Sequence, residues 1–341
     1  MITSIPVTQP FGAAIRQKAR WLMDVILHIG AHRCATTSFQ HYMRSNSKQL
    51  SAQGIGFWGP LRTRAGLFRG IQPEPKIRLN RNLKVRAQGR VQLQCAKSAE
   101  LGVTKLVISD ENMLGTMRGN ARFADLYGGA GERLSRFGEA FRGYLSDVVI
   151  NIRSPELYWA SLFGFFAQHG RGVPHPGLLE RIADTRRTWR DVISDVACAV
   201  PNARIHVFPF EQFAGQPDAQ LAQVTGRPAP RHYARERHNA TPDLALLRCI
   251  MEPAEGPLPE GHGRWMPFTD SQRAILRETY ADDLMWLASG ADGLAVLAKG
   301  PAHHKAEGHP PQSDMTRGRH DDSRHRQVAR AGRKRAARKA G

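Results

Sequence analysis

A short apolar stretch that ends in a glycine places the strongest constraint on the fold. Residues 25–29 read Val-Ile-Leu-His-Ile and meet Gly30, and the apolar residues after Thr36 recur at helical spacing. A continuous apolar run is typical of a parallel strand that is buried on both faces. Glycine allows the sharp turn between a strand and a helix. The pattern therefore predicts a buried strand, a tight loop and a helix in succession.

Three further apolar runs extend this pattern along the chain. Strands are expected at residues 105–109, 147–152 and 204–208. Helices are expected at residues 36–50, 91–101, 131–141, 155–168, 185–199, 217–224, 242–251 and 269–288. Thr269 or Asp270 can cap the last helix. Strands alternating with helices predict an α/β protein with three layers, in which helices flank a central parallel sheet.

The 341 residues, 41% of them hydrophobic, can form one large core or at most two domains. We expect a flexible N-terminal extension at 1–22, one domain at 23–290 and a basic, disordered tail at 291–341. Residues 62–90 are basic and contain prolines, which suggests a surface excursion that could cover a substrate.

Four scattered cysteines form no CxxC pair, so we expect no metal site and reduced thiols in the cytoplasm. Neither a secretory signal nor a membrane-spanning run is evident in the sequence.

The formal net charge is +19, and part of it lies in the tail. Residues 301–341 hold eleven Lys or Arg against four acids, which accounts for +7 and leaves +12 for the rest of the chain. Such a charge favours anionic ligands, among them phosphates, sulfated nucleotides, acidic glycans and nucleic acid. The basic end, Arg333-Lys334-Arg335, could contact nucleic acid or acidic lipid, or could simply aid solubility.

The expected loop carries the residue types of an anion-binding site. Its residues are Gly30, Ala31, His32, Arg33, Cys34, Ala35, Thr36 and Thr37. Backbone N–H groups of such a loop and of the following helix N-terminus bind anions, and the two threonine hydroxyls add donors. The pattern departs from G-x-x-x-x-G-K-[ST], because Ala35 replaces the second glycine and Thr36 replaces the lysine. The cation is instead Arg33, which suits a donor with one 5′-phosphate that carries a transferable group.

Two further features follow expected strands. Arg153 ends the third strand, and Ser161 lies eight positions later on a helix that Pro155 would begin. An arginine and a hydroxyl that converge on a phosphate form charge-assisted hydrogen bonds. Glu111 follows the second strand, where a carboxylate could act as a general base.

Residues 26–40, with the sequence ILHIGAHRCATTSFQ, resemble the 5′-phosphosulfate loop of the sulfotransferase family that uses 3′-phosphoadenosine 5′-phosphosulfate. The usual core of that loop is a lysine, two small residues and Thr-Thr, and bacterial members often begin with His-Ile-Gly. Arg33 stands at the lysine position. The resemblance covers about residues 24–288, is strong at the two phosphate motifs and implies a P-loop fold.

The resemblance also implies a role for each site residue. The loop amides, Thr36 and Thr37 would hold the 5′-phosphate, and Arg153 with Ser161 would hold the 3′-phosphate. Glu111 would take the proton of an acceptor hydroxyl while Arg33 stabilises the departing phosphate. No metal is required, and a carbohydrate is one candidate acceptor. In the family a basic segment covers the 3′-phosphate, and Arg235 and Arg237 match it by location and charge.

Two other functions remain open from the sequence. A P-loop kinase or nucleotidase would use ATP or GTP with magnesium, and Asp110-Glu111 resembles the end of a Walker B strand. The missing lysine counts against this reading. A non-catalytic anion-binding protein of the same fold is the second alternative, and Arg33 in place of lysine supports it.

Overall fold

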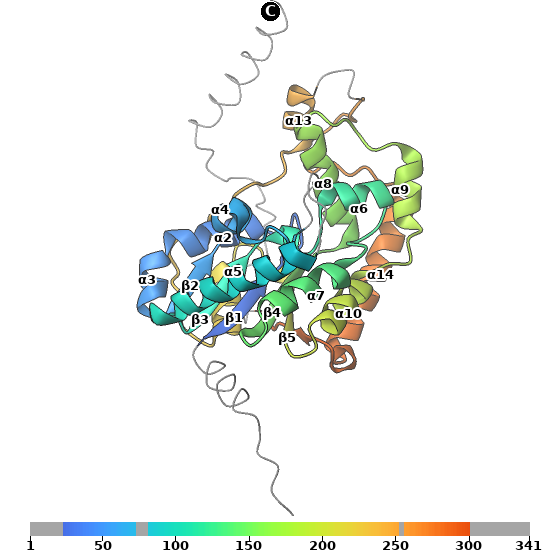
Figure 1. The fold of residues 1–341 in the computed structure, drawn as a ribbon. Coiled ribbons are helices and arrows are strands. Elements are labelled where there is room, and N and C mark those ends of the chain that lie inside the picture. The colour runs from blue at the N-terminus through green and yellow to red at the C-terminus, as the bar shows by residue number, and fades with distance from the viewer. Residues whose placement is uncertain (1–22, 73–80, 252–255, 301–341) are drawn as a thin grey trace, which may run out of the picture. The chain divides into compact units, whose positions relative to one another are not determined.

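The computed structural model describes residues 23–72, 81–251 and 256–300 (Figure 1). It confirms an α/β architecture with a central, all-parallel sheet between helices. The sheet has six strands in the order β2-β3-β1-β4-β5-β6. Their bounds are β1 (Asp24–His28), β2 (Ile55–Trp58), β3 (Lys105–Ser109), β4 (Leu145–Ile152), β5 (Arg204–Pro209) and β6 (Val296–Leu297).

The helices that precede β4 are α2 (Thr36–Ser45), α3 (Ser47–Ala52), α4 (Pro60–Arg62), η1 (Thr63–Leu67), α5 (Arg81–Glu100), η2 (Glu111–Met113), α6 (Met117–Phe123) and α7 (Ala130–Ala140). Those that follow β4 are α8 (Pro155–Gln168), α9 (Pro176–Ala183), α10 (Trp189–Ala199), α11 (Phe210–Phe213), α12 (Pro217–Thr225), α13 (Leu244–Ile250), α14 (Asp270–Ala288) and η4 (Ala291–Gly293).

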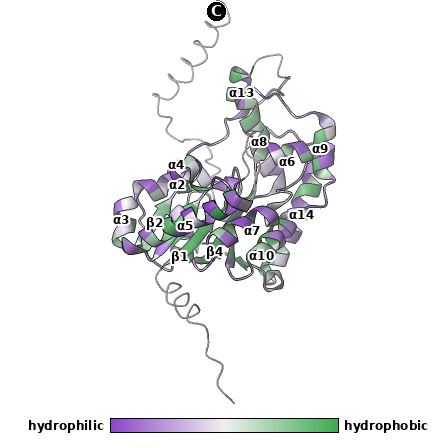
Figure 2. Ribbon diagram, viewed as in Figure 1, coloured by the Kyte–Doolittle hydropathy of each residue, from purple (hydrophilic) through white to green (hydrophobic). Residues whose placement is uncertain are grey.

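Side chains of the central strand alternate between two hydrophobic cores, one on each face of the sheet. Val25 and Leu27 pack into the larger core with residues of α5, α7 and α10. Ile26 packs on the opposite face with residues of α2 and α12. The strands are hydrophobic and lie between helices of mixed hydropathy (Figure 2). Burial of both faces explains why three successive residues of β1, Val25, Ile26 and Leu27, are apolar.

The order of the strands reverses direction at β1. β1 and β4 are neighbours, but the chain leaves β1 through α2 on one face and leaves β4 through α8 and α10 on the other. In open parallel sheets, ligands bind outside the carboxyl ends of the strands at such a reversal. The β1–α2 loop and the residues that follow β4 both lie at this point.

Four sequence expectations differ from the structure. The helix expected at 91–101 begins earlier, since α5 spans Arg81–Glu100. The expected helix at 36–50 is divided, because α2 ends at Ser45 and α3 begins at Ser47. The segment expected as a surface excursion begins in the core instead, since Phe68 and Ile71 are buried. The two-residue strand β6 pairs with β5 beyond residue 290, where the sequence suggested that the domain ends.

Other expectations lie outside the described residues. They concern the extension at 1–22, residues 73–80 and the basic tail from residue 301 onwards. Among the described residues, no helix has both the length and the apolar character needed to cross a membrane.

Candidate functional site

The β1–α2 loop, residues 29–35, has a tightly wound backbone. Gly30, Arg33 and Ala35 have φ angles of 64°, 63° and 63°, all in the left-handed region. At Gly30 a Cβ atom would lie 2.6 Å from Thr36 Oγ1, so that only glycine fits. For the two other residues this conformation costs about 1–2 kcal/mol each. Strain of this kind is concentrated at ligand-binding sites.

The wound backbone leaves amide groups available to a ligand. Within the described ranges, no group accepts a hydrogen bond from the amide N–H of Cys34, Ala35, Thr36 or Thr37. These donors lie at the N-terminus of α2, where the helix dipole favours negative charge. The Thr36 hydroxyl donates to the carbonyl of Ala31 at 3.2 Å and so braces the loop. The loop therefore has the chemistry of an anion site.

Arg33 extends from the loop to two other elements. Its Nε donates to Ser161 Oγ on α8 at 3.1 Å, and its Nη2 donates to Thr241 Oγ1 at 2.8 Å. The guanidinium carbon lies 5.0 Å from the ring centroid of Phe165. Burial, together with the charge of Arg153, lowers the pKa of Arg33 to about 10. Arg33 therefore remains a cation near neutral pH.

Arg153, directly after β4, is only 4% exposed. Its Nη1 donates to the carbonyl of Arg33 at 2.9 Å, and its guanidinium carbon lies 4.2 Å from the ring centroid of Phe210. Its Nε is buried and has no hydrogen-bond partner in the part of the chain that the structure describes. Burial is the main cause that lowers its pKa.

The two arginines form a cationic pair without a salt bridge, although Glu211 and Glu156 act on Arg153 from a greater distance. Among the described residues, no carboxylate lies within 4.0 Å of either guanidinium group. Buried charge without a partner is costly, and an anionic ligand would offset that cost. Arg33, Arg153 and Ser161, which the sequence suggested separately, are thus brought together in one place.

Glu111 lies on the other side of Gly30, whose ideal Cβ position is 3.4 Å from Glu111 Cβ. Arg64 donates to its Oε1 at 2.9 Å, and Gln40 donates to its Oε2 at 3.1 Å. Burial raises the pKa of Glu111, but nearby His32 and Arg64 more than offset this and leave it lowered. Glu111 is therefore an ionised carboxylate held beside the loop.

His32 connects the β1–α2 loop to Tyr127 and Asn112 through hydrogen bonds. Tyr127 Oη accepts from the backbone N–H of His32 at 2.8 Å and lies 3.0 Å from His32 Nδ1. His32 Nε2 lies 3.3 Å from Asn112 Oδ1, and burial lowers the pKa of the imidazole. These contacts indicate a positioning role for His32. Cys34 is buried, and burial raises its pKa to about 12, so its thiol remains protonated.

Arg235 and Arg237 do not join the arginine pair. Both are exposed, and Arg235 donates instead to the carbonyl of Gly215. The same segment nevertheless reaches the site through Thr241, whose Oγ1 is 2.7 Å from Ser161 Oγ. Thr241, Arg64 and Gln40 are site residues that the sequence analysis missed. Isolated polar residues on separate segments gave no motif that could have identified them.

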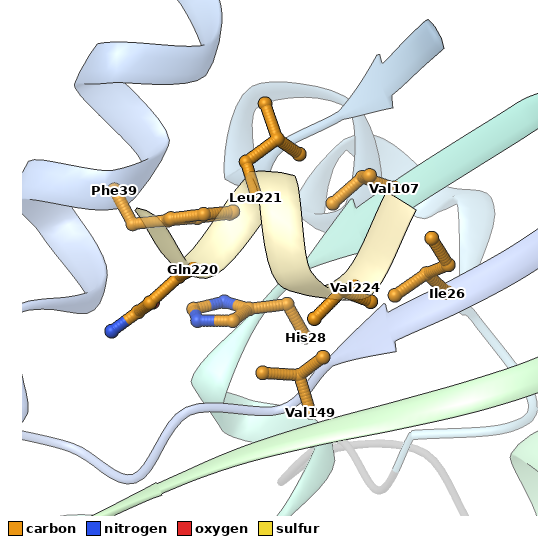
Figure 3. Close-up of a pocket in the computed structure, with 8 residues that line it drawn as sticks. All are labelled: Ile26, His28, Phe39, Val107, Val149, Gln220, Leu221 and Val224. Carbon is orange, nitrogen blue, oxygen red and sulfur yellow. The ribbon is translucent and has the colours of Figure 1, made fainter. Parts of the chain in front are cut away.

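A small cavity lies elsewhere, between the sheet and α12 (Figure 3). It is lined by Ile26, His28, Phe39, Val107, Val149, Gln220, Leu221 and Val224. Its volume of about 10 Å³ is no larger than a single water needs. The cavity cannot hold a nucleotide, and the anion chemistry lies at the carboxyl ends of β1 and β4 instead.

No protein-family model, curated protein sequence or solved structure matches this chain. The assignment of a function therefore depends on the chemistry of the site itself. That site offers wound-loop amides, two neighbouring guanidinium groups, the hydroxyls of Thr37, Ser161 and Thr241, and one ionised carboxylate.

Proposed function

We propose that the chain is a sulfotransferase that moves a sulfonate group from 3′-phosphoadenosine 5′-phosphosulfate to an acceptor hydroxyl. One observation carries the proposal. Arg33 and Arg153 meet at the carboxyl ends of β1 and β4 with Ser161 beside them, and no described carboxylate pairs with either. A ligand with two separate phosphate groups, such as this donor, matches two cationic positions with adjoining amide and hydroxyl donors.

In this proposal the segment from β1 to α2 is a P-loop. Its amides and Thr37 receive the 5′-phosphate, while Arg153 and Ser161 receive the 3′-phosphate. Ser161 Oγ and Arg33 Nε are 3.1 Å apart without the ligand. Donor binding therefore requires the Arg33 side chain to move from Ser161 towards the bridging oxygen of the phosphosulfate. Thr241 can keep one hydrogen bond to the guanidinium during this change.

The reaction follows from the positions of Arg33 and Glu111. The acceptor oxygen attacks sulfur, the bond between sulfur and the bridging oxygen breaks, and Arg33 stabilises the charge that develops on that oxygen. Glu111 takes the hydroxyl proton. Its lowered pKa makes it a weak base. A weak base suffices when the proton moves late, since the hydroxyl becomes strongly acidic as its oxygen bonds to sulfur.

The test is calorimetric titration of the purified protein with 3′-phosphoadenosine 5′-phosphate in EDTA, beside ATP with magnesium. We expect metal-independent binding of the bisphosphate that Arg153→Ala abolishes. Arg142→Ala is the matched control, because Arg142 is exposed and precedes the opposite end of β4. Absence of bisphosphate binding by the wild-type protein would refute the proposal.

Arg153 is buried, so its replacement also removes packing. Ser161→Ala provides a gentler variant, because it deletes only the hydroxyl next to Arg33. We expect it to weaken bisphosphate binding by roughly 10- to 150-fold, as loss of a hydrogen bond to a charged group costs roughly 1.5–3 kcal/mol. An unchanged circular dichroism spectrum would establish that both variants are folded.

The geometry disfavours a nucleotide kinase that binds magnesium through Asp110. The Asp110 carboxylate is fully buried and accepts hydrogen bonds from Thr63 at 2.6 Å and from Arg64 at 2.8 and 3.2 Å. Its oxygens are thus already engaged. Magnesium-dependent binding of ATP in place of the bisphosphate would nevertheless favour that function.

One observation favours a second candidate, a non-catalytic anion-binding protein. Both oxygens of Glu111 accept hydrogen bonds, from Arg64 and from Gln40. Each oxygen of the proposed general base therefore already has a hydrogen-bond partner, which favours a role without catalysis. The variant Arg33→Lys separates the candidates, since lysine cannot form both directional contacts of Arg33. An enzyme adapted to arginine loses turnover in this variant, whereas a degraded enzyme gains it. A binding protein has no turnover in either form.

A further inference from the structure

A second cluster of polar side chains lies on the outer side of α2, away from the paired arginines. His41 on α2 meets Glu236 and His238 on the segment of residues 230–241. His41 Nδ1 lies 3.2 Å from Glu236 Oε2, and His238 Nε2 lies 3.1 Å from the same oxygen. The two imidazole rings are 3.9 Å apart between centroids. Two imidazole nitrogens and a carboxylate oxygen therefore converge on one point.

We propose that His41, Glu236 and His238 form a binding site for a divalent transition-metal ion such as Zn²⁺. The ligand atoms all lie within 4.8 Å of one another. In a tetrahedral zinc site with bonds of about 2.0–2.1 Å, neighbouring ligand atoms are about 3.3 Å apart. The two nitrogen-to-oxygen distances of 3.1 and 3.2 Å differ from this value by only a few tenths of an ångström. Small side-chain shifts would admit the ion.

The ligand types decide which ions the site accepts. Imidazole nitrogen suits zinc, copper, nickel and iron, whereas magnesium and calcium prefer sets of oxygen ligands. Three protein ligands leave a fourth tetrahedral position for water, an arrangement that zinc commonly adopts. The nearby Arg235 donates a hydrogen bond to the carbonyl of Gly215. Its guanidinium group is therefore engaged by a group other than Glu236. We therefore expect Zn²⁺ to bind and Mg²⁺ not to compete.

The backbone around the cluster is already held in place. Tyr42 Oη donates to the carbonyl of Pro230 at 2.7 Å, and Asn46 Nδ2 donates to the carbonyl of His232 at 2.9 Å. The amide N–H of His238 donates to Ser38 Oγ at 2.9 Å. These bonds fasten residues 230–241 along α2 without a metal. A prearranged site loses less conformational entropy when it binds an ion.

A metal at this position would join α2 to the segment that carries Thr241. Thr241 in turn contacts Arg33 and Ser161. The metal site itself does not depend on the proposed sulfotransferase activity, because none of its ligands belongs to the anion site. Zinc binding and bisphosphate binding can therefore fail or succeed separately.

The experiment measures competition for Zn²⁺ between the full-length protein, first stripped with EDTA, and a chromophoric chelator. We expect one site per chain. His238→Ala should weaken it by at least the roughly 10–100-fold that loss of a mere supporting residue costs at metal sites. Glu236→Gln keeps the size of the side chain but removes its charge, and it should weaken the site as well. His262→Ala is the matched control, because His262 is exposed and outside the cluster.

Histidines of the tail are the main competing ligands. A variant in which all five tail histidines are replaced by asparagine should retain the site; they are His303, His304, His309, His320 and His325. In thermal unfolding, Zn²⁺ should raise the midpoint of the wild-type protein and of this tail variant, but not that of His238→Ala. Equal zinc affinity of wild type and His238→Ala, an absence of zinc binding, or loss of the site in the tail variant would each overturn the proposal.

Discussion

Ala35 has the backbone conformation of a glycine at the position where α2 begins. Its φ of 63° lies in the left-handed region. Ala35→Gly should therefore raise the free energy of unfolding by about 1 kcal/mol, since relief of the left-handed cost exceeds the added entropy of the unfolded chain. Urea denaturation measures this change. Ala31→Gly is the control and should be destabilising, because Ala31 is buried and has no positive φ. A loss of stability in Ala35→Gly would contradict the argument.

The buried imidazole of His28 makes the free energy of unfolding depend on pH. Its Nδ1 lies 2.8 Å from Ser109 Oγ and its Nε2 lies 2.9 Å from Asn151 Oδ1. Burial lowers its pKa from 6.5 to about 4. Between these values the unfolded chain binds more protons than the folded one, so stability falls as the pH falls. At 1.36 kcal/mol per unit, the contribution of His28 to this loss is about 3 kcal/mol.

Urea denaturation at pH 7 and at pH 4.5 measures this dependence. His28→Gln should have a smaller difference between the two pH values than the wild-type protein, whatever its absolute stability. His262→Gln should leave the difference unchanged, because His262 is exposed. An equal pH dependence in His28→Gln and in the wild type would show that His28 is not the source.

At the scale of elements, two helices begin with the same capping device but in different surroundings. Thr269 N–H donates to Gln272 Oε1 at 3.0 Å, and Gln272 N–H donates to Thr269 Oγ1 at 3.2 Å, at the start of α14. Thr188 caps α10 and also donates to the buried Asp283 at 2.7 Å. Thr269→Ala should cost about 1 kcal/mol of stability. Thr188→Ala should cost about 2 kcal/mol or more, since it also takes a donor from a buried carboxylate.

Thermal or urea denaturation of the two variants checks this order. Thr269→Val and Thr188→Val keep the approximate size of the side chain and should follow the same order. Equal losses for both positions would mean that the bond from Thr188 to Asp283 adds nothing to stability.

Elements with strong local patterns were predicted well from the sequence. β3 and α8 have the expected bounds, because an apolar run defines β3 and Pro155 marks the beginning of α8. β6 was missed, since a strand of two residues has no local pattern and exists through its pairing with β5. The break at Asn46 was missed as well, because its side chain reaches the distant carbonyl of His232.

The candidate site was predictable only in part, for the same physical reason. The loop around Arg33 is a local motif, and the sequence shows it directly. The contacts of Arg33 with Ser161 and Thr241 join positions 128 and 208 residues away. Such contacts depend on how the sheet is assembled, which no local pattern encodes. The cluster of His41, Glu236 and His238 escaped notice for this reason too.

At the scale of the whole molecule, the position of the candidate anion site follows from the topology of the sheet. β1 lies between β3 and β4, and the chain leaves β1 and β4 on opposite faces. Arg33 and Arg153 both lie at this reversal, while the formal net charge of +19 makes the chain attractive to anions in general. A global charge attracts any anion, whereas in our proposal the paired arginines distinguish a ligand with two phosphate groups.

Specific binding of a bisphosphate should also stabilise the whole domain against unfolding. A ligand that binds only the folded state at 100 times its dissociation constant raises the free energy of unfolding by about 2.7 kcal/mol. Thermal unfolding with 3′-phosphoadenosine 5′-phosphate should therefore show an increase of several degrees. At equal concentrations, adenosine 5′-monophosphate should give a smaller increase and adenosine none, because we propose that the arginines and loop amides recognise phosphate. The buried position of Arg153 should preserve part of the increase in high salt, which screens exposed charges far more strongly. Equal increases with adenosine and with the bisphosphate would show that the base, not the phosphates, is recognised.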